Sequence, residues 1–192
     1  MGQRLNLEIT KGGKVLANSY YHWAAYTGSA YYHTETAYNW LLANKDNYKD
    51  DRLLAIRALE STGAGLPNWD QDDDYRRIKN IRKYVSVDFQ ESRDRNAGII
   101  GCFPDSIKNT QDWAEGTAVI DLDSMSILFD VFCYYESVED IKEWCEDFDE
   151  SEVVELNYKM DELSLGELTD IINTVSSGKW VFCDGMYIAE LG

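Results

Sequence analysis

The sequence has few features that would interrupt or extend a globular fold. Only 2 of its 192 residues are proline, which leaves little room for linkers or disordered tails. Its uninterrupted apolar runs are a few residues long, far below the roughly 20 residues of a transmembrane helix, and no basic-then-apolar signal opens the chain. We therefore expect one folded domain over residues 1–192, in the cytoplasm and without a membrane partner.

Motifs that are typical of enzymes are also missing. The chain contains no GxSxG elbow, HExxH pair, P-loop or GxGxxG loop, and it begins Met1-Gly2-Gln3, which offers no N-terminal nucleophile. Its 2 histidines, His22 and His33, are the only bases available for a Cys–His pair. We predict no catalytic residue, and we keep a small hydrolase that uses His22 as an alternative.

The four cysteines show no metal-binding pattern. Cys102, Cys133, Cys145 and Cys183 lie 31, 12 and 38 positions apart, which matches no CxxC spacing. Three of them stand among apolar residues of strand-like segments, where a thiol behaves as a small buried hydrophobic group. We predict four reduced thiols, no metal and no cofactor.

Acidic charge is concentrated in the second half of the chain. The formal net charge is −17, and residues 1–100 contribute 14 Lys+Arg against 13 Asp+Glu, whereas residues 101–192 contribute 4 against 22. Such a field repels nucleic acid and anionic membranes and attracts basic surfaces, so direct nucleic-acid binding is not expected. The acids form either a solvated face or a surface for a basic partner.

Hydrophobic periodicity predicts hairpins that are separated by helices. We expect a β-hairpin over 5–23 that turns at Gly12-Gly13, helices over 30–44, 53–59 and 75–84, a strand at 97–103, a short helix from Pro104, a hairpin over 116–135, a helix from Ser137 to Asp149, a strand over 153–160, a helix over 165–175 and a final hairpin around Asp184-Gly185. Ser164 and Glu167 are expected to form a capping box for the helix over 165–175. Because the strands come in hairpins, the pattern predicts an α+β domain whose sheet is mostly antiparallel, with helices packed on it.

An aromatic stretch is the first candidate site. Eight large rings fall within residues 20–33, and because side chains alternate on a strand, they cannot all enter one core. A Thr-Gly-Ser turn follows, where the N–H groups at a helix start suit a phosphate or carboxylate, although ordinary capping uses the same residues. Arginines before the strand at 97–103 could clamp such an anion or pair with nearby acids, and Gly98 would let the backbone approach the anion closely. The candidate ligand-binding residues are His22, Tyr26, Thr27, Gly28, Ser29, Arg95 and Asn96.

Two segments carry a resemblance to a known group of proteins. They read MGQRLNLEI…VLANSYYHWAAYTGSA and SRDRNAGIIG…WAEGTAVIDLDSMSILFDVF, and they resemble a family of small uncharacterised proteins of phages and prophages of Gram-positive bacteria. The resemblance covers most of the chain and implies a place in the cytoplasm of the bacterial host. It also implies a counter-defence role, either by binding a host immune protein or by removing a nucleotide immune signal.

We formulate two hypotheses. The first is a non-catalytic counter-defence protein that sequesters a small anionic, nucleotide-like signal with the ligand-binding residues above. The second is an acidic inhibitor of a basic host defence nuclease, of the anti-CRISPR type, which mimics nucleic acid and whose binding weakens steeply with salt. Either mode is compatible with a homo-oligomer. The partner-binding residues of the second hypothesis are Glu139, Glu143, Glu146, Asp147, Asp149 and Glu150.

Overall fold

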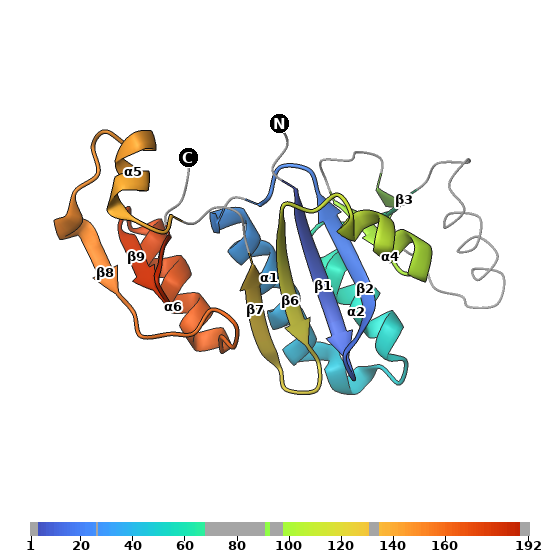
Figure 1. Cartoon of the computed structure of the whole chain (residues 1–192). Coiled ribbons are helices and arrows are strands. Elements are labelled where there is room, and N and C mark those ends of the chain that lie inside the picture. Colours follow the sequence, from blue (N-terminus) through green and yellow to red (C-terminus); the bar gives the residue numbers. More distant parts are fainter. Residues whose placement is uncertain (1–3, 26, 68–90, 93–97, 131–134, 189–192) are drawn as a thin grey trace.

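The computed structural model describes residues 4–25, 27–67, 91–92, 98–130 and 135–188. Within these residues the helices and strands form two lobes (Figure 1). The larger lobe holds a five-stranded sheet and the smaller lobe a three-stranded sheet, and helices pack on both. The predicted α+β class is therefore confirmed.

The larger lobe is built around the order β5-β2-β1-β6-β7. Its strands are β1 (Leu5–Lys11), β2 (Lys14–Tyr21), β5 (Ile99–Gly101), β6 (Gly116–Asp121) and β7 (Ser126–Asp130). Its helices are α1 (Thr27–Asn44), α2 (Asp51–Ser61) and α4 (Pro104–Gln111). Short elements are the 3-10 turn η1 (Lys45–Asn47) and the two-stranded ladder of β3 (Leu66–Pro67) and β4 (Glu91–Ser92).

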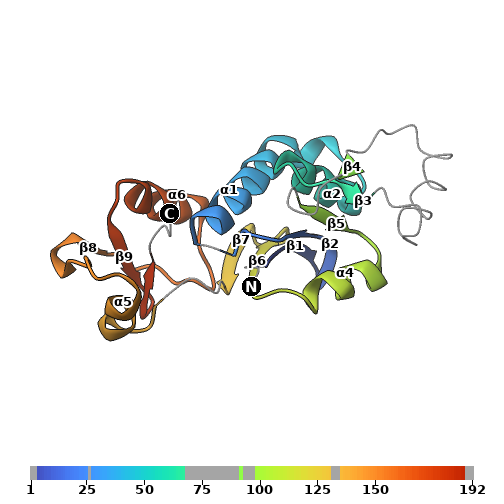
Figure 2. The ribbon, with the colours of Figure 1, turned by 90° about the horizontal axis from the view of Figure 1, so that it is seen from above.

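Side-chain alternation on β1 decides which face of the large sheet is apolar. Leu5, Leu7 and Ile9 are fully buried and lie on the face that α1 and α2 cover, whereas α4 lies on the opposite side (Figure 2). Asn6 and Glu8 point to the α4 side because neighbouring residues of a strand face opposite ways. The strand thus separates an apolar layer from a polar one.

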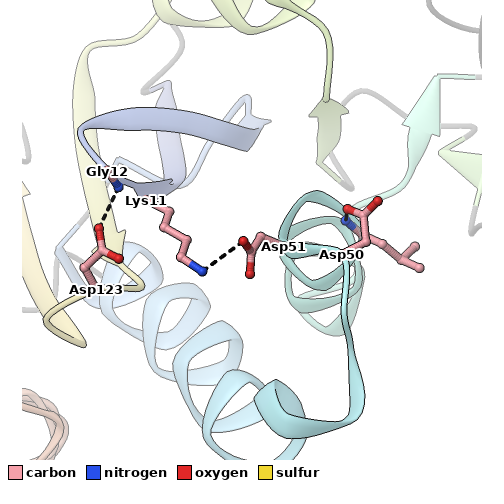
Figure 3. A network of polar contacts seen from close by, with 6 residues as sticks. Lys11, Gly12, Asp50, Asp51 and Asp123 are labelled. Carbon is pink, nitrogen blue, oxygen red and sulfur yellow. Dashed lines mark hydrogen bonds and ion pairs between the residues drawn. The ribbon is translucent and has the colours of Figure 1, made fainter.

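The first hairpin turns where the sequence predicts it. Gly12 and Gly13 have φ values of 58° and 69°, as a tight hairpin turn requires, and glycine adopts them without steric cost. The backbone N–H of Gly12 donates to Asp123 at 2.6 Å, and Lys11 pairs with Asp51 at 2.9 Å (Figure 3). These contacts tie the hairpin tip to the turn before β7 and to the start of α2.

The smaller lobe follows β7 in sequence and has the strand order β10-β9-β8. Its elements are α5 (Val138–Trp144), the 3-10 turn η3 (Glu150–Glu152), β8 (Val153–Glu155), α6 (Leu165–Ser176), β9 (Trp180–Cys183) and β10 (Met186–Ile188). Ser164 and Glu167 form the predicted capping box of α6. Asp184 and Gly185, both with positive φ, form the predicted final turn.

The two lobes share their apolar interior. The buried residues of both sheets form one contiguous cluster, and α6 packs against α1 in Figure 2. Ile127 on β7 exchanges backbone hydrogen bonds with Leu163 at 3.1 and 2.8 Å, and the ring of Tyr31 from α1 packs edge-on against Phe129. The smaller lobe is therefore anchored on the edge of the large sheet.

Several predicted boundaries and pairings differ from the structure. The large sheet is mixed, because β1 and β6 run parallel although the other three pairs are antiparallel. The helix predicted from Ser137 to Asp149 ends at Trp144, where Cys145 takes an extended conformation, and the carboxylates that follow oppose the helix dipole. The strand predicted over 153–160 pairs with β9 only over its first three residues, and β9 itself is only four residues long. The predicted helix at 75–84 lies outside the described residues.

Candidate functional site

The aromatic stretch divides between core and surface, as alternation predicts. Tyr21 is 2 % exposed, and its ring stacks on His33 of α1 with a centroid distance of 4.2 Å. Its hydroxyl is hydrogen-bonded to that of Thr62. Burial raises the pKa of Tyr21 to about 12 and lowers the pKa of His33 to about 4. His33 is therefore a neutral, partly buried residue at neutral pH.

His22 and Trp23 form an aromatic pair at the end of β2. The Nδ1 atom of His22 lies 2.9 Å from the Tyr20 hydroxyl, and the His22 ring meets Trp23 edge-on at 4.8 Å. Trp23 is 50 % exposed. A half-exposed indole beside a histidine offers one apolar face and two polar ring nitrogens to a ligand.

Two distant segments meet at the same end of the large sheet. The helix α1 begins at Thr27, with Gly28 buried and Ser29 half-buried. Ile99 of β5 pairs with Tyr20 of β2, and Gly98 lies against the Tyr21 ring. The structure therefore brings His22 and the first turn of α1 to one end of the sheet. Tyr26, Arg95 and Asn96 lie outside the described residues.

Gly98 shows why a glycine precedes β5. Its φ is +92°, and a Cβ atom there would stand 2.7 Å from Cε1 of Tyr21 and 2.9 Å from Cβ of Ala64. The sequence suggested that a glycine here allows the backbone to approach an anion. In the structure the close approach is to the Tyr21 ring, so this glycine has a packing role.

The acidic residues of the second hypothesis share one region of the smaller lobe. We call this set the acidic surface, and all of its members are exposed. Two lie on α5, two lie in the turn after it, and two lie at the start of η3. The members of the acidic surface are Glu139, Glu143, Glu146, Asp147, Asp149 and Glu150.

The charges of the acidic surface are not neutralised by described neighbours. Residues 135–188 contain 15 Asp+Glu and 3 Lys. The two ion pairs between described residues, Lys11–Asp51 and Arg57–Glu60, both lie in the larger lobe. A backbone hydrogen bond from Ser151 at 2.8 Å holds the pKa of the Asp149 carboxyl below its usual value. The Asp149 carboxylate is thus ionised at neutral pH.

An apolar base holds the acidic surface in place. Ile141 on α5 is fully buried, and Phe148 meets the Trp180 ring edge-on at 5.0 Å. Ser137 caps α5 by accepting the N–H of Asp140 at 3.1 Å. These contacts fix the backbone that carries the acids, so little conformational entropy remains to be lost when a partner binds.

A buried polar network between β1, β2 and α4 escaped the sequence reasoning. One Glu8 oxygen accepts from Asn6 and from Gln111, both at 2.6 Å. The amide nitrogen of Asn18 donates to Asn6 at 2.9 Å and to Thr110 at 2.6 Å. In the sequence these strand residues resemble an ordinary solvent face, and only the position of α4 shows that they are buried. The network joins α4 to the sheet.

The described residues give no sign of a metal site or a membrane span. No group of three or more His, Cys, Asp or Glu side chains among them could hold a metal ion. Cys102 and Cys183 are buried, as predicted, and Cys145 is partly exposed; Cys133 lies outside the described residues. None of the described helices is both long and apolar enough to cross a bilayer.

The comparisons with known proteins add no relative. No family model matches the chain, and the searches of curated proteins and of solved structures give no match either.

Proposed function

We propose that this chain is a non-catalytic binding protein whose acidic surface occupies the basic, nucleic-acid-binding groove of another protein. The observation that carries this proposal is the arrangement of six exposed carboxylates on one small lobe, without an ion pair among the described residues of that lobe. Unpaired charges of one sign create a potential that attracts a basic groove and speeds the encounter.

Charge segregation within the molecule supports the same function. Residues 1–134 hold 15 Lys+Arg and 19 Asp+Glu, whereas residues 135–192 hold 3 and 16. An acidic composition that served solubility alone would need no such division between the lobes. The concentration of charge on an anchored surface is what a nucleic-acid mimic requires, because phosphates present a dense and fixed row of negative charge.

The test compares two charge-reversed variants in a nuclease assay. Plasmid cleavage by purified CRISPR effector nucleases is measured in the presence of the wild-type protein or of a variant. The acidic-surface variant is Glu139→Lys/Glu143→Lys/Asp147→Lys. The control variant has the same charge change on the larger lobe and is Asp46→Lys/Asp112→Lys/Asp130→Lys. All three control positions are exposed. We expect the first variant to inhibit about a hundredfold more weakly, because like charges then meet across the interface, and the control to inhibit as the wild type does.

Salt provides a second measurement of the same contact. Inhibition through many carboxylates should weaken steeply between about 0.05 and 0.2 M salt, as the binding of proteins to nucleic-acid phosphates does. Equal inhibition by the wild type and the acidic-surface variant, with both folded, would contradict the proposal. Inhibition that does not change with salt would contradict it as well.

A second function is favoured by the meeting of the end of β2 and the start of α1 at one end of the large sheet. There the half-exposed His22–Trp23 pair and the first turn of α1 offer stacking and backbone N–H groups to an anionic, ring-bearing ligand. We propose sequestration of a nucleotide immune signal as this second candidate. Arg95 and Asn96 are its proposed anion clamp.

The second candidate is tested with a glycine pair. Gly28 is the second residue of α1, and Gly166 is the second residue of α6. Gly28→Val should abolish binding of a cyclic dinucleotide in calorimetry while the circular dichroism spectrum stays intact, and Gly166→Val should bind normally. Loss of folding in Gly28→Val alone would show that this glycine serves packing. Cyclic dinucleotide binding that Gly28→Val leaves unchanged would contradict the candidate.

A further inference from the structure

Exposed sheet edges are templates for another strand, and proteins usually cover them. The two larger sheets have four outer edges, which belong to β5, β7, β8 and β10. Backbone hydrogen bonds cover three of these edges among the described residues. Ile100 of β5 donates to Gly65 at 2.9 Å, Phe129 of β7 donates to Met160 at 3.0 Å, and Tyr187 of β10 exchanges bonds with Tyr135 at 2.8 and 3.0 Å.

The outer edge of β8 differs from the other three. Leu156 donates to Phe182 of β9 at 2.9 Å, so Leu156 and Val154 direct their backbone groups toward β9. Because direction alternates along a strand, the N–H and C=O of Glu155 and the C=O of Val153 point away from the sheet. No described residue bonds to the backbone of Glu155. In Figures 1 and 2, β8 lies at the outer margin of the smaller lobe.

The extended pattern continues beyond the three paired residues. Leu156, Tyr158 and Met160 are partly or fully buried, whereas Glu155, Asn157 and Lys159 are exposed. This alternation is that of a half-buried strand. The side-chain alternation therefore continues past Glu155, where the assigned strand ends.

Charge selects the kind of segment that fits this edge. Residues 146–158 contain 6 Asp+Glu and no Lys or Arg, and Glu150, Glu152 and Glu155 are exposed around the edge. A second copy of this chain paired edge to edge would bring like charges together, which destabilises a strand pair. A segment rich in Lys or Arg would place opposite charges across from these acids.

We propose that the outer edge of β8, which has no strand partner among the described residues, accepts an extended basic segment of the partner as a fourth strand of the small sheet. The C=O of Val153 and the N–H and C=O of Glu155 bind the backbone of the segment, and its alternate Lys or Arg side chains meet Glu152 and Glu155. This inference rests on the proposed function, in which a basic partner meets the acidic surface. It adds a main-chain contact that charge attraction alone does not supply.

The test separates the main-chain contact from the charge. Glu155→Pro removes an N–H that faces solvent, a position at which proline is tolerated in edge strands, and Glu155→Gln removes the same charge but keeps the N–H. The probe is a seven-residue peptide of alternating lysine and valine, and its affinity is measured by fluorescence anisotropy. We expect Glu155→Pro to bind about tenfold more weakly than Glu155→Gln, because strand hydrogen bonds are lost.

A modified peptide keeps the test decisive if Glu155→Pro fails to fold. The same peptide, N-methylated at three central residues, keeps its charge but loses backbone donors on both edges. We expect wild-type protein to bind it about tenfold more weakly than the parent peptide. Equal binding of both peptides, or equal binding by Glu155→Pro and Glu155→Gln, would overturn strand addition. Such a result would not contradict the proposed function, which the nuclease assay tests independently.

Discussion

In the larger lobe several polar side chains of the central strands are buried and bonded to one another, whereas in the smaller lobe the carboxylates of the acidic surface are exposed and form no ion pair with a described residue. Asn6, Glu8 and the amide nitrogen of Asn18 find partners within the larger lobe, whereas the Asn18 Oδ1 atom has no partner among the described residues. In the smaller lobe the acidic surface faces solvent. Satisfied buried groups make a lobe specific and rigid, and unpaired exposed charges leave binding energy available for a partner.

The sheet edges follow the same division. Both outer edges of the large sheet are covered by backbone pairs, and one outer edge of the small sheet has no described partner. We infer that the larger lobe acts as the support and the smaller lobe as the binding element. This interpretation requires that changes in the larger lobe cost stability and that changes on the acidic surface cost only binding.

The largest expected loss of stability comes from Gly98 of the larger lobe. Gly98→Ala forces a side chain into a positive φ and against the Tyr21 ring, which should cost about 4 kcal/mol from strain and overpacking together. The matched control is Gly178→Ala, which has a φ of +80° but open space around the added Cβ, and which should cost about 1 kcal/mol. Urea unfolding measures both. Equal losses would show that packing on Tyr21 contributes nothing.

A change of nearly the same size is expected from acid. The His33 pKa falls from 6.5 to about 4 on burial, so between these pH values the unfolded chain takes up a proton that the folded chain does not. The contribution of His33 to the free energy of unfolding is therefore constant above about pH 6.5, falls by about 3 kcal/mol as the pH drops toward 4, and levels off below it.

The variant His33→Phe tests this pH dependence. Phenylalanine can stack on Tyr21 but does not titrate, so we expect this variant to lose much of the fall between pH 6.5 and 4 in urea unfolding. The His33 ring proton in an NMR titration should give the pKa directly. A midpoint near the ordinary histidine value, or an unchanged pH slope in His33→Phe, would contradict the buried, neutral state of this residue.

These larger-lobe features differ in how far the sequence could predict them. Turns and caps rest on a few adjacent residues, so Gly12-Gly13, Asp184-Gly185 and the Ser164–Glu167 capping box were predicted and are confirmed. The parallel pairing of β1 with β6 joins residues more than a hundred positions apart, and no local pattern encodes it. The burial of Glu8 depends in turn on where α4 packs.

The candidate sites show the same limit. Exposure of the acidic surface follows from composition, because most charged residues cannot be buried unpaired, and the prediction is confirmed. The early end of α5 was missed, because the apolar spacing of Ile141 and Phe148 fits a helix as well as the observed turn. The free edge of β8 depends on which strand pairs with β9, which only the tertiary structure shows.

The buried network predicts an intermediate effect. Asn18→Ala removes the donor to the Asn6 oxygen and to Thr110, although the Thr110 hydroxyl keeps its bonds to the backbone carbonyls of Ser106 and Ile107. The loss of the donor should cost about 2 kcal/mol. Asn157→Ala, an exposed asparagine of the smaller lobe, should change stability by less than about 0.5 kcal/mol. Urea unfolding of the pair compares a buried and an exposed amide directly. If Asn18→Ala lowers the free energy of unfolding by less than about 0.5 kcal/mol, as a change at an exposed site does, the network does not stabilise the larger lobe.

The smallest effect on stability is expected on the acidic surface itself. Glu139 and Glu143 lie four residues apart on α5, and like charges at this spacing repel. The variant Glu139→Gln/Glu143→Gln/Glu146→Gln should therefore be more stable than the wild type by about 0.5 kcal/mol in about 0.01 M salt, and equally stable in about 1 M salt, where the repulsion is screened. Urea unfolding at both salt concentrations measures the difference.

A loss of stability above 1 kcal/mol (about twice the expected change, with opposite sign) would mean that these carboxylates hold the fold together. The contrast between a supporting and a binding lobe would then fail, because the acids could not be kept for a partner while also being needed by the chain itself.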